Sequence, residues 1–124
     1  MKMEYTKIFK ALSDKTRLRV LYVLLKLKRE LCICELMDSL GIRTYHASRC
    51  MRELKIAGLV TERKEGRFVF YKTSDNADYF QGMIYKLISS LPEKEFKDDI
   101  LRMKKRIALR KNGKVVVTMG CKTC

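Results

Sequence analysis

The sequence predicts a single domain that is mainly α-helical and carries one small β-hairpin. Three observations lead to this fold class. Apolar residues recur at helical spacing through most of the 124-residue chain. The spacing changes to a period of two in one place, around Glu65-Gly66, where glycine permits a positive φ angle. Hydrophobic residues make up 47% of the chain, which is enough to form a core and excludes wholesale disorder.

Apolar stripes and helix-terminating residues predict the first three helices of the chain. One helix is expected to stop near Ser13, and a second to run from an Asp14 cap to about Lys28. A short segment, Glu30 to Cys32, then leads into a brief helix that Gly41 terminates.

The next helix is expected to begin at a Thr44 cap and to end at Gly58. One face of it is apolar and the other is polar and basic. The stripe predicted to face the core consists of Ala47, Cys50, Met51, Leu54 and Ala57. The opposite face is therefore free to contact a partner.

Strands are expected over residues 60–64 and 67–73, followed by a helix over residues 76–91. Pro92 is expected to start another helix as a first-turn residue, and Asn112-Gly113 to close it. The sequence thus predicts a folded domain over residues 1–113 and a flexible, cysteine-containing tail over residues 114–124.

Charge and hydropathy narrow the function classes. The net charge of +14 favours a polyanionic partner, with nucleic acid first. The longest apolar stretch, Val20 to Leu25, is far shorter than the roughly 20 residues that cross a bilayer. The first residues lack the apolar run of an export signal. We therefore expect a cytoplasmic protein with no membrane partner.

Two helices joined by a glycine turn and followed by a basic hairpin form a winged helix-turn-helix. His46 and Arg49 are expected to contact base edges in the major groove, and the flanking and hairpin cations to neutralise phosphates. The predicted DNA-binding residues are Arg43, Thr44, Tyr45, His46, Ser48, Arg49, Arg52, Lys55, Arg63, Lys64 and Arg67. The alternative is a solvated basic helix without a DNA partner.

Five cysteines in a reducing compartment are more typical of metal or redox sites than of structural disulfides. Cys32 and Cys34 are two residues apart, which is about 200° around a regular helix. Both sulfurs can therefore approach one ion only if the pair straddles a helix start or bends the helix. Burial of both as ordinary core residues is the alternative. Cys50, on the apolar stripe, is expected to be a small buried hydrophobe.

Residues 8–73 resemble the ArsR/SmtB family of metal-responsive winged-helix repressors, and within it the arsenic-responsive branch. The matching motifs are residues 9–18, the Glu-Leu-Cys-Ile-Cys-Glu-Leu string at 30–36, Ser48-Arg49, Gly58-Leu59-Val60 and residues 66–71. The resemblance implies a homodimer held by its terminal helices that represses a resistance operon. It also implies release from operator DNA when Cys32 and Cys34 capture As(III) or Sb(III), with Cd(II) and Pb(II) as alternative inducers.

The chain departs from the arsenic-responsive pattern at Met37, where relatives often have a third cysteine. A thioether is a weak, neutral donor, so a third thiolate is expected from Cys121 or Cys124, in the same protomer or its partner. The two tail cysteines could instead form a reversible disulfide, or be incidental. No histidine follows His46, so a histidine-based zinc site on the terminal helix is not expected.

Other function classes remain as alternatives. A thiol-redox regulator of the same fold would oxidise the paired cysteines instead of metallating them. A metal-independent architectural protein would bind unrelated duplexes with similar affinity. A thiol enzyme such as an arsenate reductase would need a glycine-rich anion loop beside a cysteine, and the sequence has none, so no enzymatic activity is expected.

Overall fold

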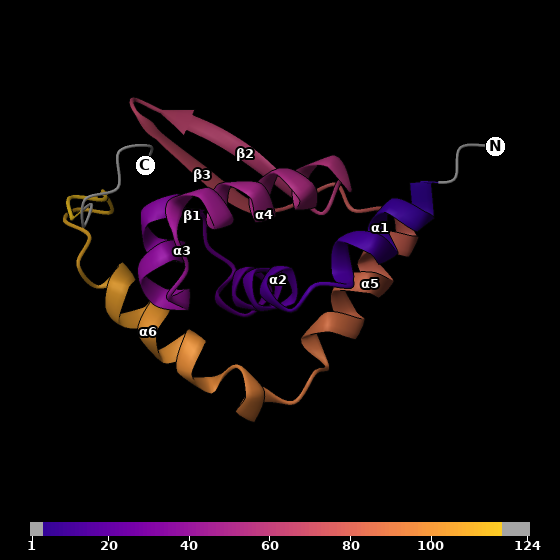
Figure 1. Cartoon of the computed structure of the whole chain (residues 1–124). Helices are drawn as coiled ribbons and strands as arrows, with labels where there is room; N and C mark the ends of the chain where they lie inside the picture. The colour runs from indigo at the N-terminus through magenta and orange to yellow at the C-terminus, as the bar shows by residue number, and fades with distance from the viewer. Residues whose placement is uncertain (1–3, 118–124) are drawn as a thin grey trace.

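The computed structural model describes residues 4–117 as a helical body with a small antiparallel sheet (Figure 1). In chain order the elements are α1 (Glu4–Leu12), α2 (Lys15–Leu27), β1 (Leu31–Cys32), α3 (Ile33–Leu40), α4 (Thr44–Ile56), β2 (Val60–Glu65), β3 (Phe68–Thr73), α5 (Tyr79–Ser89), the 3-10 turn η1 (Glu93–Glu95) and α6 (Lys97–Ile107). The predicted fold class, mainly helical with a β-hairpin wing, is confirmed. Within the described range, no helix has the length and apolar character of a membrane span.

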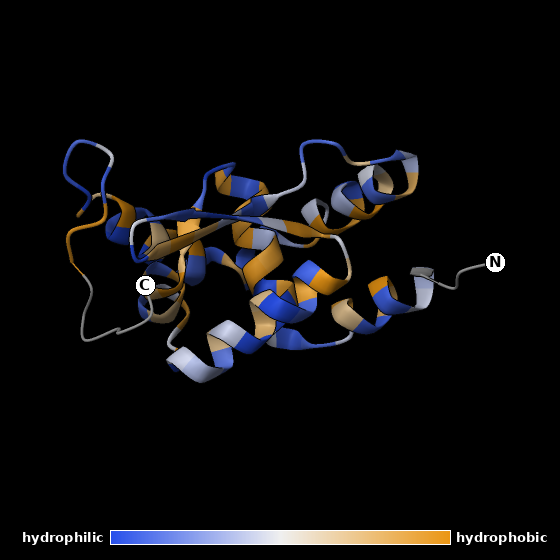
Figure 2. Ribbon diagram, turned by 90° about the horizontal axis from the view of Figure 1, so that it is seen from above, coloured by the Kyte–Doolittle hydropathy of each residue, from blue (hydrophilic) through white to orange (hydrophobic). Residues whose placement is uncertain are grey.

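Helix α2 forms the centre of the core, between α4 on one side and α6 on the other (Figure 1). The Asp14 carboxylate accepts a hydrogen bond from the Arg17 backbone N–H at 3.0 Å, so the predicted cap is confirmed. Residues 20–24 are each at most 1% exposed. The middle of α2 is therefore covered on every face, whereas its two ends and the other helices carry hydrophilic as well as hydrophobic residues (Figure 2).

The sheet has three strands in the order β1-β3-β2, all antiparallel. The short segment that the sequence placed before α3 is a strand, with Leu31 paired to Tyr71 and Cys32 paired to Phe70. Glu65 pairs with Phe68, so the hairpin loop is Gly66-Arg67, one residue later than predicted. Gly66 has φ +61°, which explains the glycine at the first loop position.

The elements after the hairpin are shorter than predicted. Helix α5 begins at Tyr79 because the Asp78 carboxylate, at 2.8 Å from the Gln81 backbone N–H, caps it. Pro92 is the residue before a single 3-10 turn, not the first turn of a longer helix. Helix α6 ends at Ile107, and Asn112-Gly113 forms the turn between Lys111 and Lys114, with both turn residues at positive φ.

Residues 114–117, which the sequence assigned to the tail, contact the helical body. Val115 is buried, and the Arg106 guanidinium donates a hydrogen bond to the Val117 carbonyl. The rest of the tail, with Cys121 and Cys124, lies outside the described residues.

Candidate DNA-binding surface and thiol site

Helices α3 and α4 form the helix-turn-helix. Gly41 ends α3 with φ +66°, and its backbone N–H donates to the Met37 carbonyl at 2.9 Å. Residues on the predicted inward stripe of α4 are all buried, namely Ala47, Cys50, Met51, Leu54 and Ala57. The opposite face of α4 therefore lies on the surface, as the sequence predicts.

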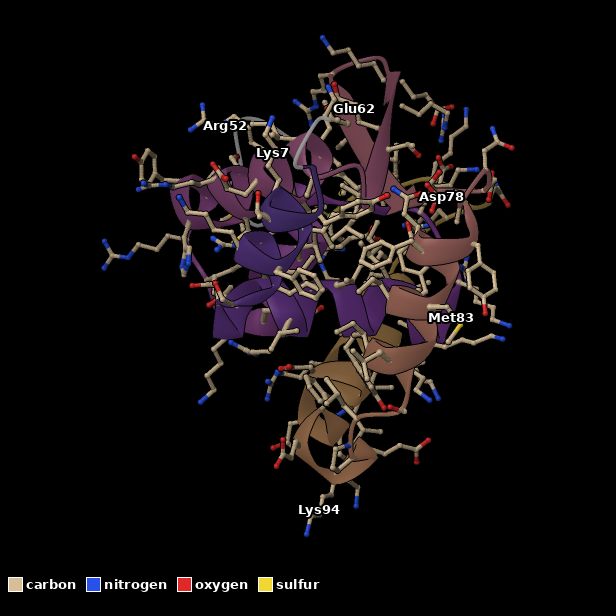
Figure 3. The ribbon with its side chains drawn as sticks, turned by 90° about the vertical axis from the view of Figure 1, so that its right-hand side faces the viewer. Lys7, Arg52, Glu62, Asp78, Met83 and Lys94 are labelled. Carbon is tan, nitrogen blue, oxygen red and sulfur yellow. The ribbon has the colours of Figure 1, made fainter. Side chains whose placement is uncertain are left out.

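The polar face of α4 is exposed along its length. Tyr45 is 74% exposed. Exposed with it are His46, Ser48, Arg49, Arg52 and Lys55, and Arg43 just before the helix. In Figure 3, Arg52 and the wing residue Glu62 lie at the same end of the molecule. In the part of the protein that the structure describes, α4 and the hairpin therefore lie on the same surface.

Thr44 differs from its predicted role. The N-cap of α4 is Arg43, and Thr44 is the first helical residue, so the predicted cap is wrong by one position. The Thr44 hydroxyl donates to the Met37 sulfur at 3.0 Å and is half-buried. This hydrogen bond fixes the turn between α3 and α4.

The wing cations differ in their partners. The Arg63 guanidinium donates to both oxygens of Glu30, at 2.9 to 3.2 Å, and lies 5.0 Å from the Phe70 ring centroid. Lys64 and Arg67, near the tip, have no carboxylate partner in the described part of the chain. The tip therefore carries the less compensated positive charge.

Lys55 at the end of α4 is also neutralised. Its ammonium group forms an ion pair with Glu62 on β2. Among the predicted phosphate-contacting residues, Lys55 and Arg63 are therefore already paired with carboxylates. Arg49 and Arg52 have no such partner in residues 4–117.

Cys32 and Cys34 straddle the start of α3, as the spacing predicts. Cys32 is the N-cap, with extended backbone at φ −98° and ψ 170°, and Cys34 lies in the first turn. Both are buried, and Cys32 is a free thiol. Burial raises the pKa of the Cys32 thiol above its ordinary value of 9.0. Cys32 therefore disfavours the thiolate form until another group stabilises the charge.

Glu35 and Arg110 complete the surroundings of Cys32. The Cys32 backbone N–H donates to Glu35 Oε1 at 3.1 Å. Arg110 donates to the same carboxylate through Nε (2.7 Å to Oε2) and Nη2 (2.5 Å to Oε1), and also to the Glu30 carbonyl at 2.8 Å. Glu35 is fully buried, so this ion pair lies inside the protein beside the cysteines.

Three more arginines attach α3 to the rest of the body. Arg106 Nε donates to Asp38 at 2.6 Å, and Arg102 Nε to the Ser39 carbonyl at 2.6 Å. Arg19 joins the Leu40 carbonyl at 2.9 Å and pairs with the buried Asp99. The carbonyls at the end of α3 thus have cationic donors, which stabilise a helix C-terminus.

Sequence reasoning missed this set of arginines and Glu35. Two signals were present. Glu35 stands three residues after the N-cap, which is capping-box spacing. Arg102, Arg106 and Arg110 recur every four residues, which places successive side chains on one side of a helix.

The described residues contain no group of three or more His, Cys, Asp or Glu side chains arranged to hold a metal ion. The half-buried Met37 sulfur, which stands where the resemblance places a third cysteine, accepts the Thr44 hydroxyl hydrogen bond. Cys50 is a free, buried thiol on α4, and burial raises its pKa from 9.0 to about 11. Cys50 is therefore the hydrophobic core residue that the sequence predicts.

Comparisons with known proteins agree on one family of bacterial regulators. Residues 14–62 match the model of the bacterial regulatory proteins of the arsR family. The chain is 44% identical over 73 residues to a cadmium resistance transcriptional regulatory protein, CadC homolog, of Staphylococcus aureus, covering 59% of this chain and 60% of that protein. It is 30% identical over 97 residues to the arsenic resistance transcriptional regulator ArsR2 of Pseudomonas putida, covering 78% of this chain and 84% of that protein.

Among solved structures, reduced HlyU from Vibrio cholerae is similar in fold. The TM-score is 0.60 at 30% sequence identity, over 71% of this chain and 87% of HlyU. The names of the relatives divide between cadmium and arsenic resistance, so they do not select the arsenic-responsive branch. The match to ArsR2 covers most of both chains, and the matched family segment contains the helix-turn-helix described above. The chain therefore belongs to the arsR family of bacterial transcriptional regulators, which are DNA-binding winged-helix proteins and not enzymes.

Proposed function

We propose that this chain is a homodimeric repressor that binds an inverted-repeat operator and leaves it when a thiophilic ion binds Cys32 and Cys34. The observation that carries the proposal is the position of the cysteine pair. It lies at the first turn of α3, and α3 packs directly against α4, the helix that presents the exposed polar face. An ion that changes the geometry of α3 therefore acts one helix away from the DNA-binding surface.

The DNA-binding surface supports an operator with two half-sites. His46 and Arg49 on α4 are exposed and placed to contact base edges, while Arg43, Arg52 and the wing tip neutralise phosphates. Two such helices in a symmetric dimer contact half-sites about 34 Å apart, or a multiple of that distance. Operator DNA lies in the cytoplasm, where the protein is expected to act.

An exposed apolar face supports the dimer. Its members lie on α1 and α5, which pack together through Phe80: the Phe80 ring centroid is 4.9 Å from that of Tyr5. The exposed residues are Tyr5, Phe9, Tyr79, Met83 and Leu87, each between 46% and 84% exposed. Large exposed side chains at i, i+4 and i+8 on α5 form a continuous stripe that a second copy can cover.

As(III) or Sb(III) is the proposed inducer, with Cd(II) or Pb(II) as alternatives. Thiolates suit all four ions, and trivalent arsenic prefers three of them. Cys121 or Cys124 is the proposed source of the third, from the same protomer or its partner. The raised pKa of Cys32 means that ion binding must displace a proton, so capture is expected to strengthen as the pH rises.

The test is a fluorescence-anisotropy titration of the reduced protein on its own upstream promoter DNA. Arsenite, antimonite, Cd(II), Pb(II) and Zn(II) are added in parallel, with unrelated DNA as the control. Release of specific DNA by near-stoichiometric arsenite or antimonite supports the proposal. Specific binding that no ion disturbs overturns the sensor assignment, and equal binding to unrelated DNA overturns the operator.

A thiol-redox regulator is the second proposed function. The free Cys32 thiol and the solved structure of HlyU in a form described as reduced favour testing it. Mild oxidant would then lower the mass by two hydrogens per disulfide and change operator affinity in the absence of any ion. Oxidation without a change in affinity would exclude this function.

A further inference from the structure

A cleft of about 540 Å³ lies between α2, η1 and α6. Apolar side chains of α2 and α6 and lysines of α2, η1 and α6 line it. Figure 1 shows α6 on the side of α2 away from α4 and the hairpin, and Figure 3 shows Lys94 at the opposite end of the molecule from Arg52 and Glu62. The cleft is therefore separate from the DNA-binding surface and from α4.

The inner part of the cleft is apolar. The Tyr22 ring stacks on Phe96 with 4.0 Å between centroids and 15° between planes, and Tyr22 is 1% exposed. Ile100 and Leu101 of α6 extend this apolar surface. The Tyr22 hydroxyl is buried and has no hydrogen-bond partner in the described part of the protein. Tyr22 is enclosed by its neighbours, so Leu27, Ile100 and Leu101 form the accessible part of this apolar surface.

The rim of the cleft is strongly basic. Lys26 pairs with Glu93 at 3.8 Å, and Glu93 is the only acidic residue among those that line the cleft. Lys94, Lys97 and Lys104 have no carboxylate partner within residues 4–117. Three uncompensated ammonium groups around an apolar floor complement a ligand with one anionic head and an apolar body.

We propose that this cleft binds a small amphipathic anion, an apolar chain or ring that carries a single carboxylate. Its volume lies within the roughly 300 to 1,000 Å³ of typical small-molecule sites. The apolar body contacts Leu27, Ile100 and Leu101, and the carboxylate contacts the rim lysines. A DNA phosphate would gain nothing from the apolar floor, and the DNA-binding residues lie on another face.

The site is separate from the thiol site, but α6 connects the two. Arg102 and Arg106 of α6 hold Ser39 and Asp38 of α3, while Ile100, Leu101 and Lys104 of the same helix line the cleft. The proposal concerns binding alone, and it stands or fails independently of the inducer. The proposed ligand of the cleft is an organic anion and is distinct from the proposed inducing ion.

The test is isothermal titration calorimetry of the reduced full chain with decanoate, and with 1-decanol as the neutral analogue. We expect one decanoate per chain and at least roughly tenfold weaker binding of decanol. A triple variant, Lys94→Ala, Lys97→Ala and Lys104→Ala, is expected to weaken decanoate binding by roughly tenfold or more. All three lysines are exposed, so the fold is expected to survive.

A matched control variant removes three exposed lysines elsewhere, Lys7→Ala, Lys10→Ala and Lys15→Ala, with the same change in net charge. It is expected to bind decanoate like the unmodified chain. Leu101→Asp places a carboxylate in the cleft and is expected to abolish binding. No decanoate binding, equal binding of decanol, or an equal loss in the control triple variant would each overturn the proposal.

Discussion

Arg110 and Glu35 form a buried ion pair next to the cysteine site. Arg110 donates through Nε at 2.7 Å and through Nη2 at 2.5 Å, and the same carboxylate accepts the Cys32 backbone N–H at 3.1 Å. The side chains are 9% and 0% exposed. A residue that follows α6 thus fixes the start of α3, so the thiol site depends on the segment beyond the matched family residues 14–62.

Removing Arg110 is expected to destabilise the protein strongly. Arg110→Met leaves the Glu35 carboxylate buried without its partner, which typically costs about 3 to 5 kcal/mol. The exposed pair of Arg63 with Glu30 provides the control, because Arg63→Met is expected to cost about 0 to 1 kcal/mol. Urea denaturation of the reduced proteins measures both. Adding Glu35→Gln to Arg110→Met should recover part of the loss, and equal effects of the two arginine variants would contradict the role of burial.

Cys32→Ser and Cys34→Ser are expected to bind operator DNA but to resist release by the inducing ion, because each lacks one of the two thiolates of the proposed ion site. Cys50→Ser is the matched control, since Cys50 is also buried and lies on α4. Anisotropy with and without the ion gives the response. Full release of the Cys32→Ser protein, or equal loss of response in Cys50→Ser, would contradict the proposed site.

The wing tip is expected to dominate the electrostatic contribution of the hairpin. Lys64→Ala and Arg67→Ala should each lower the slope of log affinity against log salt by about 1, because each loses one phosphate contact. Arg63→Ala should lower it by less than half as much, because Glu30 already holds that guanidinium. The measurement is the affinity of each variant for operator DNA at several salt concentrations between about 50 and 200 mM. Identical slopes for all three variants would show that the Glu30 pair opens on DNA.

The helix-turn-helix could be predicted because its signals are local. Gly41 and the apolar stripe of α4 occupy neighbouring stretches of sequence, and helical periodicity reports which side of a helix faces the core. The position of Cys32 and Cys34 on either side of the start of α3 followed from the same helical periodicity. Each of these features depends on residues within about one or two helical turns of each other.

The surroundings of the thiol site could not be predicted in the same way. Arg110 and Glu35 are 75 residues apart in the chain, and no local pattern reports a long-range pair. The end of α6 was misplaced for a related reason. Asn112-Gly113 is a genuine turn signal, but it serves the Lys111–Lys114 bridge after the helix has already ended.

Substitutions on α5 are expected to separate the proposed dimer. Leu87→Glu, and independently Met83→Glu, places a charge in the exposed apolar stripe, which should weaken self-association by on the order of 100-fold. Leu109→Glu is the control, because Leu109 is 48% exposed and lies on neither α1 nor α5. Sedimentation velocity over a concentration series measures the dissociation constants. Unchanged dimers in both α5 variants would place the interface on another surface.

Cys50 is expected to make the stability of the protein depend on pH in the alkaline range. Burial raises its pKa from 9.0 to about 11, so the folded protein holds the thiol proton more tightly than the unfolded chain does. The contribution is fully present below pH 9 and is lost as the pH rises through the folded pKa, an effect of at most about 3 kcal/mol. Cys50→Ala removes this titration and leaves the other alkaline groups, such as Cys32, in place. Urea denaturation of both proteins between pH 8 and pH 11 should therefore show the free energies of unfolding converging as the pH rises, whereas parallel curves would mean that the Cys50 thiol ionises in the folded protein near its ordinary pKa.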